Sequence, residues 1–306
     1  MYKEKIEALK KEKNAVILAH FYQNDEIQEV ADFVGDSLAL SRIASTTNAD
    51  IIVFCGVFFM AETAKILSPE KKVLLPKKDA LCRMASMADY NELKEYKIAN
   101  PDTIIVTYVN TRANIKALSD VIVTSSNAEK IIKHYQDKHM MYVPDKNLGL
   151  YLKDKLNLNI DVWPGYCYIH EELTIKDVAL QVSLHPNAEL LVHPEAPLEV
   201  LKKANYVGST KQILDYATNS KNNEFIIGTD KGIIHALKKA NPNKKFYLLS
   251  NNLSCVDMKK ISLEDLYLSL ENETFEIEVD ENIRKEAVKA LNRMMELSWW
   301  LKNVMY

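Results

Sequence analysis

Three cysteines stand at nearly equal intervals along this chain. Cys167 follows Cys82 by 85 residues, and Cys255 follows Cys167 by 88. Each comes after a short apolar run. The middle run lies in Asp161–His170, where we expect a strand that breaks at a Pro-Gly pair and delivers Cys167 and His170 onto a loop. Three similar units that each end in one thiol predict that the fold gathers the three sulfur atoms on one metal centre.

The spacing of the thiols limits the type of metal centre. Thiolates from distant segments suit zinc or an iron–sulfur cluster, whereas the C-x-x-C spacing of zinc ribbons and ferredoxins does not occur here. Three thiolates on a 4Fe-4S cluster would leave one iron without a protein ligand, and that iron could act as a Lewis acid in a dehydration. The alternative is that the cysteines are small buried hydrophobes. We favour it for Cys55, which has no counterpart in the other units.

A second group of polar residues follows the apolar runs that we expect to be strands. Groups at the carboxyl ends of parallel strands point out of one edge of a sheet, where α/β proteins bind ligands. A set of His, Glu and Tyr side chains there can transfer protons near neutral pH, although a single such residue is more often a capping group. The residues concerned are His20, Tyr22, Tyr108, Asn110, His193 and Glu195.

Serines mark three predicted helix starts, in the sequences GDS, TSS and GST. Ser37, Ser125 and Ser209 each stand where a helix dipole and free backbone N–H groups favour an anion. For any one of them, capping the helix is the simpler explanation. Three equivalent starts facing one axis would instead bind a substrate with several negative charges. A nucleotide is not expected, because the chain has neither a Walker A nor a Rossmann glycine motif.

The order of these features repeats three times, and the repeat must position them. Short apolar runs alternate with segments of helical periodicity, which is typical of parallel β/α units. We expect eleven strands, in AVILAHF, DIIVFCGV, KKVLLP, TIIVTYVN, DVIVTSS, MMYVPD, IDVWP, AELLVHP, ANYVGST, EFIIGTD and KKFYLLS. The residues that fall into register are Tyr22, Asn110 and Glu195, and then Ser37, Ser125 and Ser209. The repeat predicts an α/β fold of three related units around a pseudo-threefold axis, with the carboxyl ends of the strands facing it.

The same repeat sets the expected domain boundaries. The first unit would span residues 1–85, the second 86–172 and the third 173–280. The last stretch, 281–306, belongs to no repeat and carries apolar residues at helical spacing. We expect it to be a helix that packs on the first unit and so completes that domain.

Composition excludes several classes of function. The 306 residues are 47% apolar and 26% charged, as in ordinary soluble proteins. A net charge of −3 and only five arginines argue against a nucleic-acid partner. The N-terminal MYKEKIEALKKEKN predicts a helix rather than a signal peptide, and the longest apolar run, Ile51–Ala61, is too short to span a membrane. We therefore expect a cytoplasmic protein with reduced thiols.

Longer motifs make the chain similar to a known family. It resembles quinolinate synthase, the quinolinate synthase A family, over roughly residues 14–270. The motifs that carry the resemblance in order and spacing are AHFYQ, GDSLALS, FCGVFFMAETAKIL, LCRMASM, YVNTRANIKALSDVIVTSSNA, VPDKNLG, WPGYCYIH, VHPEAP, VGST and CVDMKK.

The resemblance implies a fold, a cofactor and a reaction. The fold would be three three-layer α/β/α domains with short parallel sheets around a central site. An oxygen-sensitive 4Fe-4S cluster would be held by Cys82, Cys167 and Cys255 and would act as Lewis acid in a dehydration. The enzyme would be a transferase that condenses iminoaspartate with dihydroxyacetone phosphate to quinolinate, releasing phosphate and water, in NAD biosynthesis.

The resemblance also implies residue roles. The substrate-binding residues would be His20, Ser37, Tyr108, Asn110, Ser125, His170, His193, Glu195, Ser209 and Thr210. The catalytic residues would be Tyr22, Glu195, His193 and Tyr108. Of these, Tyr22 and Glu195 look like the proton-transfer groups. Three positions depart from the family pattern: Phe58 stands where His is expected, Arg83 where Pro is common, and Asp230 where Glu is usual.

Partners and alternatives follow from the chemistry. The imine is unstable in water, so a transient partner, an L-aspartate oxidase or dehydrogenase, is expected to supply it. Two other functions stay open: an aconitase-type iron–sulfur hydro-lyase acting on a hydroxy acid, and an iron–sulfur sensor or carboxylate-binding regulator. The sensor would need an interaction surface or a DNA-binding helix, and no basic recognition segment occurs.

Overall fold

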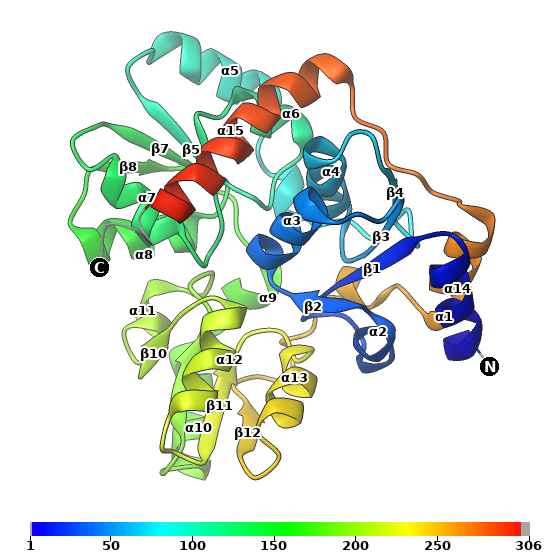
Figure 1. Ribbon diagram of the computed structural model, residues 1–306. Coiled ribbons are helices and arrows are strands. Elements are labelled where there is room, and N and C mark those ends of the chain that lie inside the picture. Colours follow the sequence, from blue (N-terminus) through cyan, green and yellow to red (C-terminus); the bar gives the residue numbers. More distant parts are fainter. Residues whose placement is uncertain (1, 301–306) are drawn as a thin grey trace.

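Three four-stranded parallel sheets form the protein, as the computed structural model in Figure 1 shows. The structure describes residues 2–300. The strand orders are β2-β1-β3-β4, β6-β5-β7-β8 and β10-β9-β11-β12, so the same chain path occurs three times. This arrangement confirms the α/β class and the repeated strand order predicted from the sequence.

The first sheet contains β1 (Ala15–His20), β2 (Phe33–Gly35), β3 (Ile51–Cys55) and β4 (Lys72–Leu74). The helices around it are α1 (Tyr2–Glu12), α2 (Asp25–Val30), α3 (Ser37–Thr46), α4 (Phe58–Leu67) and, from later in the chain, α14 (Leu263–Asn272). Successive residues of β1 face opposite sides, so both faces need apolar cover. Leu18 packs in the core that contains α3 and α4, whereas Ile17 packs in the core that contains α1 and α14.

The second sheet contains β5 (Ile104–Tyr108), β6 (Val121–Val123), β7 (Met140–Val143) and β8 (Ile160–Val162). Its helices are α5 (Tyr90–Ala99), α6 (Ala113–Leu118), α7 (Ala128–His134) and α8 (Lys146–Leu156), after a 3-10 turn, η1 (Met84–Ser86). Val106 lies in the core with residues of α7 and α8, and Ile105 lies with residues of α5 and α6. This sheet too is the middle of three layers.

The third sheet contains β9 (Glu189–Val192), β10 (Tyr206–Val207), β11 (Glu224–Gly228) and β12 (Lys245–Leu248). The short helix α9 (Tyr168–Glu171) ends the second unit. The helices of the third are α10 (Ile175–Leu184), α11 (Leu198–Leu201), α12 (Thr210–Asn219) and α13 (Ile233–Ala240), followed by a 3-10 turn, η2 (Asp257–Lys259). Ile226 packs with residues of α10 and α11, and Ile227 with residues of α12 and α13.

Two expectations about the elements were wrong. The strand β2 was not expected, because it lies at the edge of its sheet with Phe33 45% exposed. The C-terminal helix α15 (Glu281–Trp300) packs chiefly against α6 and β6 of the second sheet, with a smaller contact to α4 of the first. Figure 1 shows it, in red, lying along the second unit. Residues 301–306 of the predicted helix lie outside the described residues.

The docking of α15 follows from its apolar face. Ala287, Leu291 and Met294 of this helix are buried in the core that also holds the second sheet. A buried hydrogen bond from Asn127 Nδ2 to Ser298 Oγ, 2.9 Å, fixes the helix to the start of α7. We propose 1–85, 86–172 and 173–280 as the limits of the three units, since each sheet falls within one of these ranges, whereas α15 joins the second unit rather than the first.

The three units meet where three of their helices begin. Asp36 precedes α3, Ser126 lies just before α7, and Ser209 precedes α12. The Ser126 hydroxyl donates a hydrogen bond to Asp36 Oδ2 (2.5 Å) and is hydrogen-bonded to Ser209 Oγ (2.7 Å). One side chain of the second unit therefore joins the corresponding positions of the first and third. No helix between residues 2 and 300 combines the length and the apolar content needed to cross a membrane.

Candidate active site

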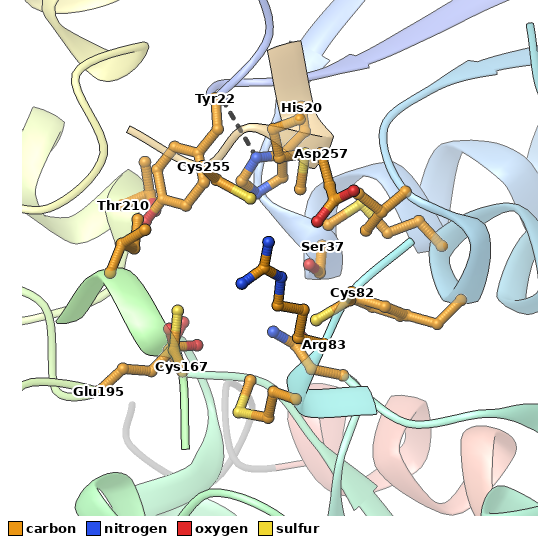
Figure 2. Close-up of a pocket in the computed structure, with 18 of the residues that line it drawn as sticks. His20, Tyr22, Ser37, Cys82, Arg83, Cys167, Glu195, Thr210, Cys255 and Asp257 are labelled. Atoms are coloured by element: carbon orange, nitrogen blue, oxygen red, sulfur yellow. Dashed lines mark hydrogen bonds between the residues drawn. The ribbon is translucent and has the colours of Figure 1, made fainter. Parts of the chain in front are cut away.

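A cavity at the junction of the three units contains most of the residues that the sequence analysis singled out (Figure 2). Those that line it are His20, Tyr22, Ser37, Cys82, Tyr108, Asn110, Ser125, Cys167, His193, Glu195, Thr210 and Cys255. They come from all three sheets because the carboxyl ends of parallel strands lie at one edge. The site therefore belongs to no single unit.

Two histidines show how the strand ends are built. The backbone N–H of Tyr22 donates to His20 Nδ1 (3.1 Å), and that of Glu195 donates to His193 Nδ1 (3.4 Å). The same local turn thus occurs in the first and third units. Burial and the nearby Lys259 lower the pKa of His20 to about 3, and burial lowers the pKa of His193 to about 4. Both imidazoles are therefore neutral at neutral pH, with Nε2–H left as the donor.

Glu195 is a buried carboxylate with partners from the second unit. It is 4% exposed. The Tyr108 hydroxyl donates to Glu195 Oε1 (2.6 Å), and His170 Nδ1 lies 2.9 Å from Oε2. Burial acts to raise the pKa of Glu195, but His193, His170 and Tyr108 outweigh burial and hold the pKa below its ordinary value. The side chain is therefore ionised and can accept a proton.

A chain of hydroxyl and imidazole groups connects Glu195 to Tyr22. His170 Nε2 lies 2.9 Å from Thr229 Oγ1, and the Thr229 hydroxyl is 2.5 Å from the Tyr22 hydroxyl. The Thr210 hydroxyl donates to the same tyrosine oxygen (3.0 Å). Burial and the charge of Glu195 raise the pKa of Tyr22 well above its ordinary value, so the phenol keeps its proton.

Sequence reasoning missed Thr229 and Asp145. Thr229 is fully buried and directly follows β11. Its position at the end of a strand, like that of the other site residues, could have identified it as a candidate. Asp145 follows β7 at the same edge. Its Oδ1 accepts from the Leu148 N–H (2.8 Å), while Oδ2 has no hydrogen-bond partner among residues 2–300. Burial and the charge of Glu195 raise the pKa of Asp145 well above its ordinary value.

Two of the predicted residues do not line the cavity. His170 lies behind it, fully buried, with Nδ1 3.2 Å from Cys167 Sγ. Ser209 caps α12, where its hydroxyl accepts from the Gln212 N–H (3.2 Å). Ser125 lines the cavity but is not at a helix start. The Asn127 side chain accepts from the Thr124 N–H (2.7 Å) and closes a turn first, so α7 begins three residues later.

The departures from the family pattern lie in different places. The Phe58 ring packs under Arg112, whose Cζ is 4.3 Å from the ring centroid, and Phe58 is not among the cavity residues. Asp230 lies behind the site, where it accepts from the Cys255 N–H (2.6 Å) and pairs with Lys259 (3.1 Å). Arg83 lines the cavity.

Three thiols line the cavity, and they do not form a site for a single metal ion. Ligand atoms bound to the same metal ion lie no farther apart than two metal–sulfur bond lengths, ~4.6 Å. Among residues 2–300, the group whose ligand atoms all lie within 4.8 Å of one another is Cys167, His170 and Glu195; it contains neither Cys82 nor Cys255. The three cysteines have free thiols, as an iron–sulfur cluster requires. The donor set, three free thiols that line one cavity, is the kind that an iron–sulfur cluster takes.

The thiols also influence each other electrostatically. Burial raises the pKa of Cys82 to about 12, and the proximity of Cys255 adds to this rise. Burial, Glu195 and the other two thiols raise the pKa of Cys167. A metal group must therefore displace protons to bind here. Cys55 is fully buried in β3 and confirms the expectation of a core residue.

The chain is similar to known proteins over almost its whole length. The family described as "Quinolinate synthetase A protein" matches residues 4–296. A quinolinate synthase of Caldicellulosiruptor saccharolyticus is 51% identical over 297 residues, 97% of this chain and 98% of the relative. A quinolinate synthase of Clostridioides difficile is 48% identical over 96% of this chain and 97% of its own. Quinolinate synthase 2 of Methanosarcina acetivorans is 46% identical over 96% of this chain and 95% of its own.

The Thr229→Val substitution tests the buried network. It keeps the shape of the side chain and leaves the Tyr22 hydroxyl and His170 Nε2 without their shared partner. We expect the free energy of unfolding to fall by about 1–3 kcal/mol, because buried polar groups lose a hydrogen bond. Denaturant unfolding measures this, with Thr229→Ser as the control that keeps the hydroxyl. Equal stability of the valine variant and the wild type would contradict the network.

Proposed function

Since the chain belongs to the quinolinate synthase A family, we propose that it condenses iminoaspartate with dihydroxyacetone phosphate to give quinolinate, phosphate and water in NAD biosynthesis. The observation that supports this most is the single cavity that three thiols line together with Glu195, a buried carboxylate that His170 contacts from behind the cavity. Acid–base groups and a metal-binding set within one cavity suit a condensation that ends in dehydration.

Cys82, Cys167 and Cys255 would hold a 4Fe-4S cluster. When bound, a cluster with three protein ligands supplies a Lewis-acidic iron that assists the departure of a hydroxyl group. Apolar side chains also line the cavity, among them Val57, Phe59 and Met60. Few water molecules then compete with the substrate for the site.

Substrate charge would be neutralised by hydrogen-bond donors in the cavity. The start of α3 at Ser37 and the start of α12 at Thr210 both reach it, and helix starts favour carboxylate and phosphate groups. The neutral His20 and His193 offer Nε2–H groups, and Asn110 offers an amide. These donors would orient the two carboxylates of the imine and the phosphate of the triose.

Proton transfer would use the chain of groups from Glu195 to Tyr22. The enamine carbon of iminoaspartate forms the new C–C bond as phosphate leaves, and the amine then closes the ring on the carbonyl. Glu195, ionised, accepts a proton from carbon, and Tyr22 gives its phenolic proton to a departing oxygen. The chain through His170 and Thr229 returns a proton to Tyr22, because each neighbouring pair is within hydrogen-bond distance.

Because the imine is unstable in water, the enzyme that makes it should act close to this protein. We propose that an L-aspartate oxidase or dehydrogenase delivers it to this chain in the cytoplasm.

An anaerobic assay with both substrates tests the function. We expect the purified protein, with its cluster reconstituted, to form quinolinate from iminoaspartate and dihydroxyacetone phosphate, as measured by chromatography. An aconitase-type hydro-lyase would instead dehydrate a hydroxy acid and form no quinolinate. Failure to form quinolinate while the visible spectrum shows an intact cluster would therefore reject the proposal.

The Glu195→Gln substitution tests the proton-transfer role. The amide keeps the size of the side chain but cannot take up a proton, so turnover should fall by about 10²- to 10⁴-fold. Glu199→Gln makes the same chemical change on an exposed face of α11 and should leave turnover unchanged. Near wild-type turnover in Glu195→Gln, with the cluster intact, would remove Glu195 from the catalytic groups.

A further inference from the structure

Arg83 occupies the mouth of the cavity. It directly follows Cys82, begins the turn η1, and is exposed while lining the cavity. Figure 2 shows its side chain reaching over the space between the labelled cysteines. Leu81, on the other side of Cys82, is 44% exposed and lines the same mouth.

Arg83 is the one Lys or Arg among the residues found to line this cavity. The acidic residues that line it are Asp36, Glu195 and Asp257. His20 and His193 add no positive charge, since burial keeps their imidazoles neutral at neutral pH. Lys259 lies outside the cavity lining and pairs with Asp230 (3.1 Å). A substrate with several negative charges would thus meet one permanent cation on entry.

A stacked tyrosine holds the guanidinium. Arg83 Cζ lies 4.6 Å from the centroid of the Tyr168 ring, and the Tyr168 hydroxyl accepts a hydrogen bond from the Val256 N–H (3.0 Å). Arg83, Tyr168 and Val256 each directly follow one of the three cysteines. The contact therefore links the three thiol-bearing loops across the mouth and restricts where the guanidinium can lie.

The N–H groups of Arg83 are free for a ligand. Among residues 2–300, no carboxylate pairs with Arg83, whereas the half-buried Arg112 is paired with Glu62 (3.0 Å). A guanidinium that stacks on an aromatic ring through its face keeps its edge for hydrogen bonds, and that edge matches a carboxylate or phosphate in a bidentate geometry.

We propose that Arg83 is an anion-binding residue at the cavity mouth, which binds the phosphate or a carboxylate of an incoming substrate and is positioned by Tyr168. The identity of that substrate rests on the proposed function. The binding itself does not, because any small oxyanion that enters the cavity would be bound in the same way. Arg83 attracts the anion and orients its charged end, and the hydrogen-bond donors inside the cavity bind the remaining polar groups of the substrate.

Calorimetric titration of the anaerobically purified holoprotein tests this. The probes are inorganic phosphate and malonate, which stand for the two kinds of anionic group. Arg83→Gln should weaken binding of at least one probe by about 10- to 100-fold, as expected for the loss of hydrogen bonds from a charged donor. Arg83→Lys keeps the positive charge but cannot form the bidentate hydrogen bonds of a guanidinium, so its loss of affinity should be smaller. Arg293→Gln removes the same charge from the surface of α15 and should bind both probes as the wild type does.

The outcomes separate the alternatives. Loss of phosphate binding alone assigns Arg83 to the phosphate end of a substrate, and loss of malonate binding alone assigns it to a carboxylate. Tyr168→Leu, which removes the aromatic ring beside Arg83, should weaken binding of the same probe. Equal binding in Arg83→Gln and the wild type, or a wild type that binds neither probe, would overturn the proposal.

In the quinolinate assay, Arg83→Gln should raise KM and leave kcat nearly unchanged. A protein that binds the probes but makes no quinolinate would refute the proposed function alone.

Discussion

A buried carboxylate, Glu195, constrains how the three units can pack. A charge that is removed from water must be paired, and loss of one partner of such a pair typically destabilises a protein by about 3–5 kcal/mol. Glu195 extends from the third unit, and two of its partners, Tyr108 and His170, come from the second. His170 in turn contacts Thr229 of the third unit, which contacts Tyr22 of the first. The network that stabilises the charge therefore also fixes the relative positions of the three units.

The threefold repeat explains how such a network could arise. Tyr22, Asn110 and Glu195 occupy equivalent places after the first strand of each unit, yet they are a phenol, an amide and a carboxylate. Equivalent backbone positions thus carry different chemical groups to one cavity. The helix starts behave similarly: Asp36, Ser126 and Ser209 meet by hydrogen bonds, although Asp36 and Ser209 cap their helices and Ser126 does not. Similar units supply the framework, and divergent side chains supply the chemistry.

Much of the fold could be predicted from sequence, because long apolar strands and regularly spaced cysteines leave a clear pattern. The pattern fails where an element lies at an exposed sheet edge or where its contacts lie far away in sequence. The strand β2 is an edge strand with Phe33 45% exposed, and α15 docks on a surface that no local periodicity reveals. The start of α7 depends on the Asn127 side chain rather than on the repeat. Thr229 and Asp145 were missed because a buried hydroxyl or carboxyl after a strand resembles an ordinary turn residue until its neighbours are known.

The proposed chemistry requires Cys82, Cys167 and Cys255 to hold one cluster together. Iron analysis with Mössbauer spectroscopy of anaerobically purified protein tests this directly. We expect about four iron atoms per chain in a 4Fe-4S spectrum, lost in the Cys→Ser variant at each of the three positions and retained in Cys55→Ser. A single metal ion that survives Cys82→Ser and Cys255→Ser but not Cys167→Ser would place an ion at Cys167, His170 and Glu195 instead, and would contradict a shared cluster.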